Sequence, residues 1–182
     1  MRRRAHPTLM QPSSRVLPIL SAAVVAAFTF SGCSSPSDPP DGATATVTRV
    51  VDGDTIVVDY EGHDVTIRLI GVDTPETKKP NTPVQCFGPE ASARTTELLP
   101  AGTPVRLERD VEARDKYDRL LAYVHRQPDD LFINAVLIDE GLARPLRFPP
   151  NTTYANEFQQ AADTAKANDV GLWGACPEVE SP

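Results

Sequence analysis

The feature that most constrains the fold is an alternation of apolar and polar side chains from Ala45 to Ile70. Apolar residues occupy one face of each of two stretches that meet at Glu61-Gly62, namely Ile56, Val58 and Tyr60, then Val65, Ile67 and Leu69. Side chains of a strand point alternately to its two faces, so this pattern with a glycine turn predicts a β-hairpin. The same period places Arg68 opposite to the apolar row, where it can point into a cleft.

The remaining segments predict further short strands and late helices. Proline and an acid in a first helical turn, with proline and glycine after the last, predict a helix at 88–99. Strands at 104–110 and 119–125 follow, then a helix at 131–140 and a third that carries Phe158 and ends near Asn168. This order favours a β-rich α+β fold, an OB-type five-stranded Greek-key barrel with about three α-helices. A parallel α/β sheet would need a helix after nearly every strand.

The N-terminus has the pattern of a leader. Residues 1–32 contain four arginines and no acid, and an apolar run from Val16 to Phe30 ends in Ser31-Gly32-Cys33. A basic start, a short apolar stretch and small residues predict a signal peptide at 1–32. The apolar run is interrupted by Pro18 and is shorter than the roughly 20 residues of a transmembrane helix.

Small residues before a cysteine resemble the bacterial lipobox, so we expect Cys33 to be lipidated and to anchor the protein at the outer face of a membrane. Cleavage without lipidation remains the alternative, because Phe30 stands where a lipobox usually has leucine. The stretch 33–43 is rich in Ser, Pro and Asp and is predicted to be a flexible linker, and 177–182 to be a C-terminal tail. Once Cys33 carries lipid, Cys86 and Cys176 remain as a pair in an oxidising compartment, which predicts a disulfide.

The net charge of the chain argues against nucleic acid as a partner. Without residues 1–32 the chain keeps 14 basic residues against 25 acids, a net charge of −11. Non-specific nucleic-acid binders are usually basic, so such a partner would require a local cationic site or a bound metal. The acidity could equally keep an exported protein soluble.

Three polar clusters lie where predicted strands begin or end. The first two are Val51-Asp52-Gly53-Asp54-Thr55 and Val72-Asp73-Thr74-Pro75-Glu76, and the third is Asp115-Lys116-Tyr117-Asp118-Arg119. Either acidic motif alone is also an ordinary turn sequence, and the third cluster is also typical of a solvated charged turn. Because the hairpin returns the chain to its start, Asp54 and Asp73 should meet at one end of the barrel, and hard cations bind several such oxygens.

Six motifs in this order resemble the staphylococcal nuclease family from about Ala45 to Trp173: VDGDT, TIRLIGVDTPET, CFGPEA, DKYDRLLAYV, NAVLIDEGLA and GLW. The resemblance implies an OB barrel with three helices at 44–176. It also implies calcium-dependent hydrolysis of DNA and RNA that leaves the phosphate on the 3′ side.

The resemblance implies a role for residues at matching positions. Asp54 and Asp73 would bind Ca²⁺ together with the backbone carbonyl of Thr74, and Glu76 would orient or deprotonate water. The phosphate would be bound by two arginines, Arg68 and Arg119.

Lys116 and Tyr117 would contact a neighbouring phosphate of the substrate. The sequence departs from the family at Leu146 and Phe148, where tyrosines that stack on bases are frequent. It also departs at Asp118, where glycine is common and where an acid could tether Arg119.

The expected protein is therefore a monomeric, exported phosphodiesterase at the cell surface or outside the cell. The alternative is an exported OB-fold module that binds nucleic acid or another anion without cutting it, because a fold by itself does not define an activity. A pure binding module would have no need to keep the acids, the two arginines and Glu76 together.

Overall fold

The computed structural model of the chain describes residues 38–78 and 82–176. The predicted signal peptide at 1–32, the lipidated Cys33 and the tail at 177–182 lie outside the described residues. In the part of the chain that is described, no helix has both the length and the apolar character needed to cross a membrane.

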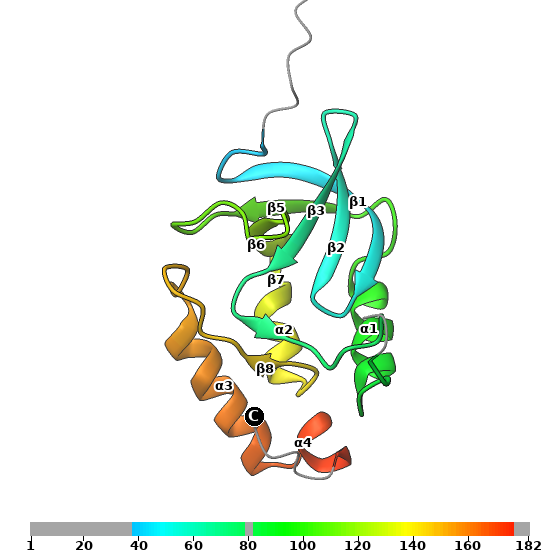
Figure 1. The fold of residues 1–182 in the computed structure, drawn as a ribbon, viewed down its shortest axis with the longest axis vertical. Coiled ribbons are helices and arrows are strands. Elements are labelled where there is room, and N and C mark those ends of the chain that lie inside the picture. The colour runs from blue at the N-terminus through cyan, green and yellow to red at the C-terminus, as the bar shows by residue number, and fades with distance from the viewer. Residues whose placement is uncertain (1–37, 79–81, 177–182) are drawn as a thin grey trace, which may run out of the picture. The chain divides into compact units, whose positions relative to one another are not determined.

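One sheet of six strands forms the centre of the fold, in the order β3-β2-β1-β5-β6-β7 (Figure 1). Its strands are β1 (Ala43–Asp52), β2 (Thr55–Tyr60), β3 (His63–Leu69), β5 (Pro104–Glu108), β6 (Leu120–Arg126) and β7 (Leu131–Phe132). A parallel pairing of β3 with β6, in which Ile67 faces Leu120, closes a barrel. The barrel strands are β1, β2, β3, β5 and β6. The predicted five-stranded OB-type barrel is thus confirmed, with β7 added at its edge.

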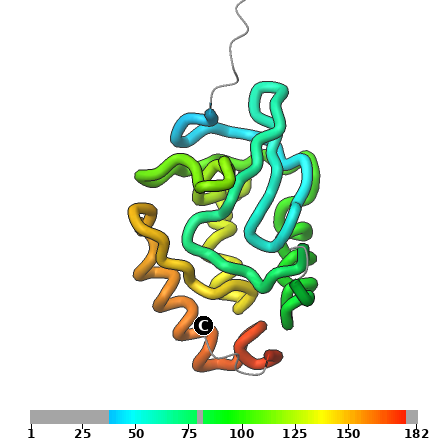
Figure 2. The backbone as a smooth tube through the Cα atoms, in the orientation of Figure 1, coloured from blue at the N-terminus to red at the C-terminus, as the bar shows by residue number. Residues whose placement is uncertain are grey.

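The predicted hairpin is formed by β2 and β3, which pair antiparallel from Thr55 opposite Arg68 to Tyr60 opposite His63. Glu61 and Gly62 make its turn, and both have a positive φ, of 53° and 83°. Two such residues give the turn a twist that matches the right-handed twist of the flanking strands. Figure 2 shows the hairpin as the long loop of the cyan and teal part of the chain.

Four helices and a small second sheet complete the described structure. The helices are α1 (Gly88–Leu98), α2 (Ile133–Asp139), α3 (Ala155–Ala167) and α4 (Leu172–Ala175), and β4 (Val72–Asp73) pairs with β8 (Arg144–Pro145). Helix α2 begins later than predicted, because Leu131 and Phe132 pair with β6 as a strand. The turn of helix at α4 was not predicted. Apolar side chains from the barrel, α1, α2 and α3 form one continuous core.

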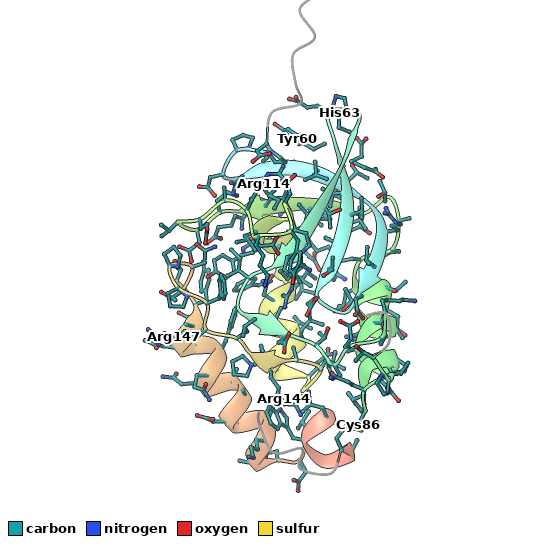
Figure 3. The ribbon with its side chains drawn as sticks, in the orientation of Figure 1. Tyr60, His63, Cys86, Arg114, Arg144 and Arg147 are labelled. Carbon is teal, nitrogen blue, oxygen red and sulfur yellow. A yellow bond between two sulfur atoms is a disulfide. The ribbon has the colours of Figure 1, made fainter. Side chains whose placement is uncertain are left out.

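The chain before β1 is attached to the domain. The backbone N–H of Arg109 donates to the Asp41 carboxylate at 2.8 Å, and the Arg109 guanidinium donates to the Pro39 carbonyl at 2.6 Å. Asp38 forms an ion pair with Arg114, which is labelled in Figure 3. Residues 38, 39 and 41 of the predicted linker thus contact arginines that lie some 70 residues later, which composition does not reveal.

Candidate active site

The hairpin and the short strand β4 bring the first two polar clusters together. Asp54 immediately precedes β2, Arg68 lies near the end of β3, and Asp73 ends β4. The Arg68 Nη2 atom lies 3.1 Å from Asp54 Oδ2 and 3.4 Å from Asp73 Oδ1. The two carboxylates thus meet at one end of the barrel, as the hairpin geometry predicted, and both face one guanidinium.

Arg68 is fixed in place by its other nitrogen. Its Nη1 atom donates to the backbone carbonyls of Leu69 and Val72, both at 2.7 Å, and its side chain is only 12% exposed. A guanidinium stays charged at any ordinary pH, so Arg68 neutralises part of the charge of Asp54 and Asp73. It leaves the apolar row of the barrel and reaches the cleft, as its position in the strand predicted.

The carboxylates of this cluster are electrostatically crowded. Partial burial is the first cause that raises the pKa of Asp73, and the negative charge of Asp54 is the second; Arg68 and Arg144 act in the opposite sense. Asp54 accepts hydrogen bonds from the Thr55 hydroxyl at 3.0 Å and from the Thr74 N–H at 3.1 Å. A cation placed between the two acids would relieve their repulsion.

Thr74 lies directly against the first acidic motif. A Cβ atom at Gly53 would come within 2.7 Å of Thr74 Oγ1, so only glycine allows the two segments to approach this closely. Thr74 Oγ1 is also buried, and it has no hydrogen-bond partner among the described residues. This contact holds the Thr74 backbone beside Asp54, where its carbonyl was predicted to bind metal.

Glu76 is held by residues to which the sequence analysis gave no role. Its backbone N–H donates to Gln85 Oε1 at 2.8 Å, and its carboxylate accepts the Lys78 N–H at 2.7 Å. A side-chain hydrogen bond also joins Glu76 to Asp52, which is buried. Burial is the main cause that raises the pKa of Asp52, and the bond to Glu76 adds to it, although bonds donated by Thr77 and Gly53 oppose the shift. No periodicity or spacing signals the pairing with Gln85.

The third cluster supplies an arginine beside an aromatic ring. The Arg119 guanidinium lies 5.4 Å from the centre of the Tyr117 ring, and Lys116 Nζ lies 5.0 Å from it. The suggestion that Asp118 tethers Arg119 is wrong, because Asp115 binds Arg119. Asp118 instead pairs with Arg114 at 3.3 Å. Its φ of 64° is a left-handed conformation, which explains why glycine suits this position.

A cavity of about 550 Å³ brings the predicted residues together. Seven of the eight residues predicted to bind metal, act in catalysis or contact substrate line it, and the exception is Lys116. Lys116 lines an adjacent cavity of about 330 Å³, along with Tyr117, Leu146 and Phe148. Arg68 and Arg119 line both cavities, so the two are neighbours around the same pair of guanidinium groups.

The oxygen atoms around Asp54 and Asp73 suit a hard cation more than a soft one. Within the described ranges there is no group of three or more His, Cys, Asp or Glu residues arranged to bind a metal ion. Ca²⁺ usually takes about six to eight oxygen ligands. Two carboxylates and the Thr74 carbonyl would therefore need water or substrate oxygens to complete the set. The raised pKa of Asp73 fits a position that favours added positive charge.

The disulfide predicted from the cysteine count is present between Cys86 and Cys176. Figure 3 labels Cys86, which lies beside α4 at the end of the loop that follows Glu76. Such a bond persists in oxidising compartments.

Comparison with known proteins identifies close relatives. The model of the family described as staphylococcal nuclease homologue matches residues 66–175. A thermonuclease of Staphylococcus intermedius is 49% identical over 132 residues, which cover 72% of this chain and 77% of that protein. Endonuclease YncB of Bacillus subtilis (strain 168) is 45% identical over 130 residues, which cover 70% of this chain and 60% of that protein.

Proposed function

This chain belongs to the staphylococcal nuclease family, and on that premise we propose that it is a calcium-dependent nuclease that hydrolyses phosphodiester bonds of DNA and RNA. The observation that carries this proposal is the single cavity around which Arg68, Arg119 and the acids gather. Hydrolysis of a phosphodiester requires groups that bind the phosphate and stabilise its developing negative charge, and two guanidinium groups beside a cluster of carboxylates suit that task. The related endonucleases support the same reaction class.

Arg68 and Arg119 bind the scissile phosphate in this proposal. A phosphodiester carries one negative charge and gains more as water attacks, so cations that are already oriented stabilise the transition state more than the ground state. Arg68 is oriented by two backbone carbonyls, and Arg119 by Asp115. Little reorganisation is then needed when the charge develops.

Glu76 takes the proton from the attacking water. As the new P–O bond forms, the bond from phosphorus to the 5′ oxygen breaks. The 5′ oxygen leaves with the bonding electrons and takes up a proton from solvent water, and the phosphate remains on the 3′ side. Ca²⁺ bound by Asp54, Asp73 and the Thr74 carbonyl would stabilise the developing negative charge and neutralise the acids. Lys116 and Tyr117, on the side of the second cavity, contact a neighbouring phosphate of the same strand.

We also propose that the protein is exported. The signal peptide at 1–32 and lipidated Cys33 would place the nuclease domain, at 44–176, at the outer face of a membrane as a monomer. The disulfide supports an oxidising location. Extraction of cells would test the anchor. The wild-type protein should be released by detergent but not by buffer, whereas Cys33→Ser should not require detergent.

The test of the activity is digestion of plasmid DNA and of RNA by purified protein that begins at Ser34, without the lipid anchor, first with Ca²⁺ and then with a chelator. We expect cleavage of both substrates with Ca²⁺ and none with the chelator. Binding of an oligonucleotide without any cleavage would favour the non-catalytic module instead.

A further inference from the structure

We propose that Gln85 is a positioning residue for Glu76, and that the Cys86–Cys176 disulfide fixes Gln85 in turn. This inference rests on the proposed role of Glu76 as the group that accepts a proton from water. Gln85 lines the same cavity as Glu76, although nothing in its sequence context marks it as functional.

Two hydrogen bonds connect Gln85 to the backbone of Glu76. The Gln85 side-chain Oε1 accepts the Glu76 N–H at 2.8 Å, and the Gln85 N–H donates to the Glu76 carbonyl at 3.0 Å. Gln85 therefore satisfies both backbone polar groups of Glu76. The two hydrogen bonds join Glu76 and Gln85 at the wall of the cavity that both residues line.

The next residue, Thr77, is held by Asp52. Asp52 accepts hydrogen bonds from the Thr77 hydroxyl at 2.8 Å and from the Thr77 N–H at 3.4 Å. A Cβ atom at Gly88 would approach the Glu76 carbonyl to 3.3 Å, so helix α1 begins directly against this segment. The segment Glu76-Thr77 is thus bonded to Gln85 and to Asp52 and lies against the start of α1.

The side-chain bond from Gln85 is exposed to solvent, and a single exposed hydrogen bond contributes little by itself to holding a segment in place. The disulfide at the next residue, Cys86, holds Gln85 more firmly than this hydrogen bond alone. Cys86 is bonded to Cys176, whose N–H donates to Leu172 at 3.0 Å, and the N–H of buried Leu172 donates to Gly141 at 2.8 Å. Gln85 is therefore tied through α4 to the core beside α2.

A proton acceptor must lie within hydrogen-bond distance of the water it activates, so its backbone position matters. A displacement of about 1 Å can lower a rate by as much as about 100-fold. Gln85 acts on the geometry of Glu76 and not on substrate affinity, so its loss should appear in kcat and hardly in KM.

The experiment compares two isosteric variants at saturating Ca²⁺ and at a temperature well below the Tm of each. Gln85→Met removes the acceptor, whereas Gln85→Glu keeps an acceptor of the same length. We expect Gln85→Met to lower kcat roughly tenfold with KM within about twofold of wild type, and Gln85→Glu to restore kcat to within about threefold. Gln159→Met on α3, far along the chain from the site, is the matched control and should have wild-type kinetics.

A double-mutant cycle tests the link to the disulfide. Replacing both cysteines by serine should lower kcat in the wild-type background but change it by less than about twofold in the Gln85→Met background, because in this proposal the disulfide acts on Glu76 mainly through the Gln85 side-chain acceptor.

Each contrary result has a distinct meaning. Wild-type kcat in Gln85→Met, or equal losses in Gln85→Met and Gln85→Glu, would overturn the positioning role. Independent, multiplicative losses in the cycle would overturn the link through Cys86. A wild-type protein that cuts nothing would refute the proposed function instead.

Discussion

Asp115 holds the guanidinium of Arg119 through one carboxylate oxygen, whose distances to Nε and Nη2 are both 2.7 Å. The other oxygen accepts the backbone N–H groups of Arg119 at 3.0 Å and of Tyr117 at 2.9 Å. The Asp115 side chain is 12% exposed, so this is a partly desolvated ion pair and not a surface contact. One partly buried acid thus fixes both the loop and the arginine proposed to bind phosphate.

Asp115→Asn should therefore impair catalysis without removing any group that touches substrate. The amide keeps the size of the side chain but loses the charge that orients Arg119. We expect kcat/KM to fall roughly tenfold, the lower end of the range for a charged hydrogen bond. Steady-state cleavage of a labelled oligonucleotide measures this. Asp163→Asn on α3 is the control, and equal kinetics in both variants would contradict the assignment.

The same ion pair predicts a pH dependence of stability. Burial alone would raise the pKa of Asp115, but the hydrogen bonds from the Arg119 side chain and from two backbone N–H groups outweigh it and lower the pKa. A lowered folded-state pKa stabilises the fold above the usual pKa of Asp, about 3.9, and this contribution is lost as the pH falls through the lower, folded value. In urea titrations, wild type should be more stable than Asp115→Asn at pH 7. The difference should shrink below about pH 4; a constant difference would argue against the ion pair.

Arg68→Lys and Glu76→Gln should separate cutting from binding. Lysine keeps the charge but not the two-pronged geometry of arginine, and glutamine keeps the size of Glu76 but accepts no proton at neutral pH. We expect each to lower kcat by about 10²- to 10³-fold, the loss typical for one preorganised group.

Binding of a short oligonucleotide should stay within roughly tenfold of wild type, about 1.4 kcal/mol. Arg147→Lys is the matched control for Arg68, because Arg147 is exposed and lines neither cavity. Undiminished cleavage by Glu76→Gln would refute its role as the proton acceptor.

Ca²⁺ should stabilise the fold, because it would bind the native acids and not the unfolded chain. At a concentration 100 times its Kd the gain is about 2.7 kcal/mol, which a rise in Tm over the chelated protein would report. The pKa of Asp73 is raised, so its charged form is disfavoured in the native state without metal, and that cost disappears as the pH falls through the raised value.

Protons should therefore compete with Ca²⁺ at Asp73, and the rise in Tm should shrink as the pH falls from neutral through the raised pKa of Asp73. Asp73→Asn should abolish most of the rise at pH 7. A Tm that responds equally to Ca²⁺ in wild type and Asp73→Asn would place the cation elsewhere.

Removal of the disulfide should lower stability substantially. The bond joins residues separated by 90 positions. A closed loop of that length corresponds to about 4–5 kcal/mol in chain-entropy models, which we take as an upper value. Cys86→Ser with Cys176→Ser should shift the urea midpoint by up to that amount. Wild-type protein that begins at Ser34 can be purified without reductant, denatured and treated with an alkylating reagent. If two thiols react, the disulfide does not exist in solution.

The sequence by itself determined the local features of this protein. The alternation of apolar and polar side chains, together with a glycine turn, predicted the β2–β3 hairpin. The same two-residue period placed Arg68 away from the apolar row. These signals are readable because strand periodicity and turn conformation depend on neighbouring residues. The two acidic motifs flank the hairpin, so their meeting near Arg68 followed from its geometry. The roles given to these residues came from the family resemblance and remain to be tested.

Only the tertiary structure decided which side chains pair. Asp115 and Asp118 are equally plausible neighbours of Arg119 in the sequence, and the left-handed backbone at Asp118 accompanies its pairing with Arg114 instead. Gln85 bonds to the backbone of Glu76 beside a cysteine whose partner lies 90 positions away, and Asp38 meets Arg114 across 76 positions of the chain. Such contacts depend on how the closed barrel packs against its helices, and no local pattern encodes that packing.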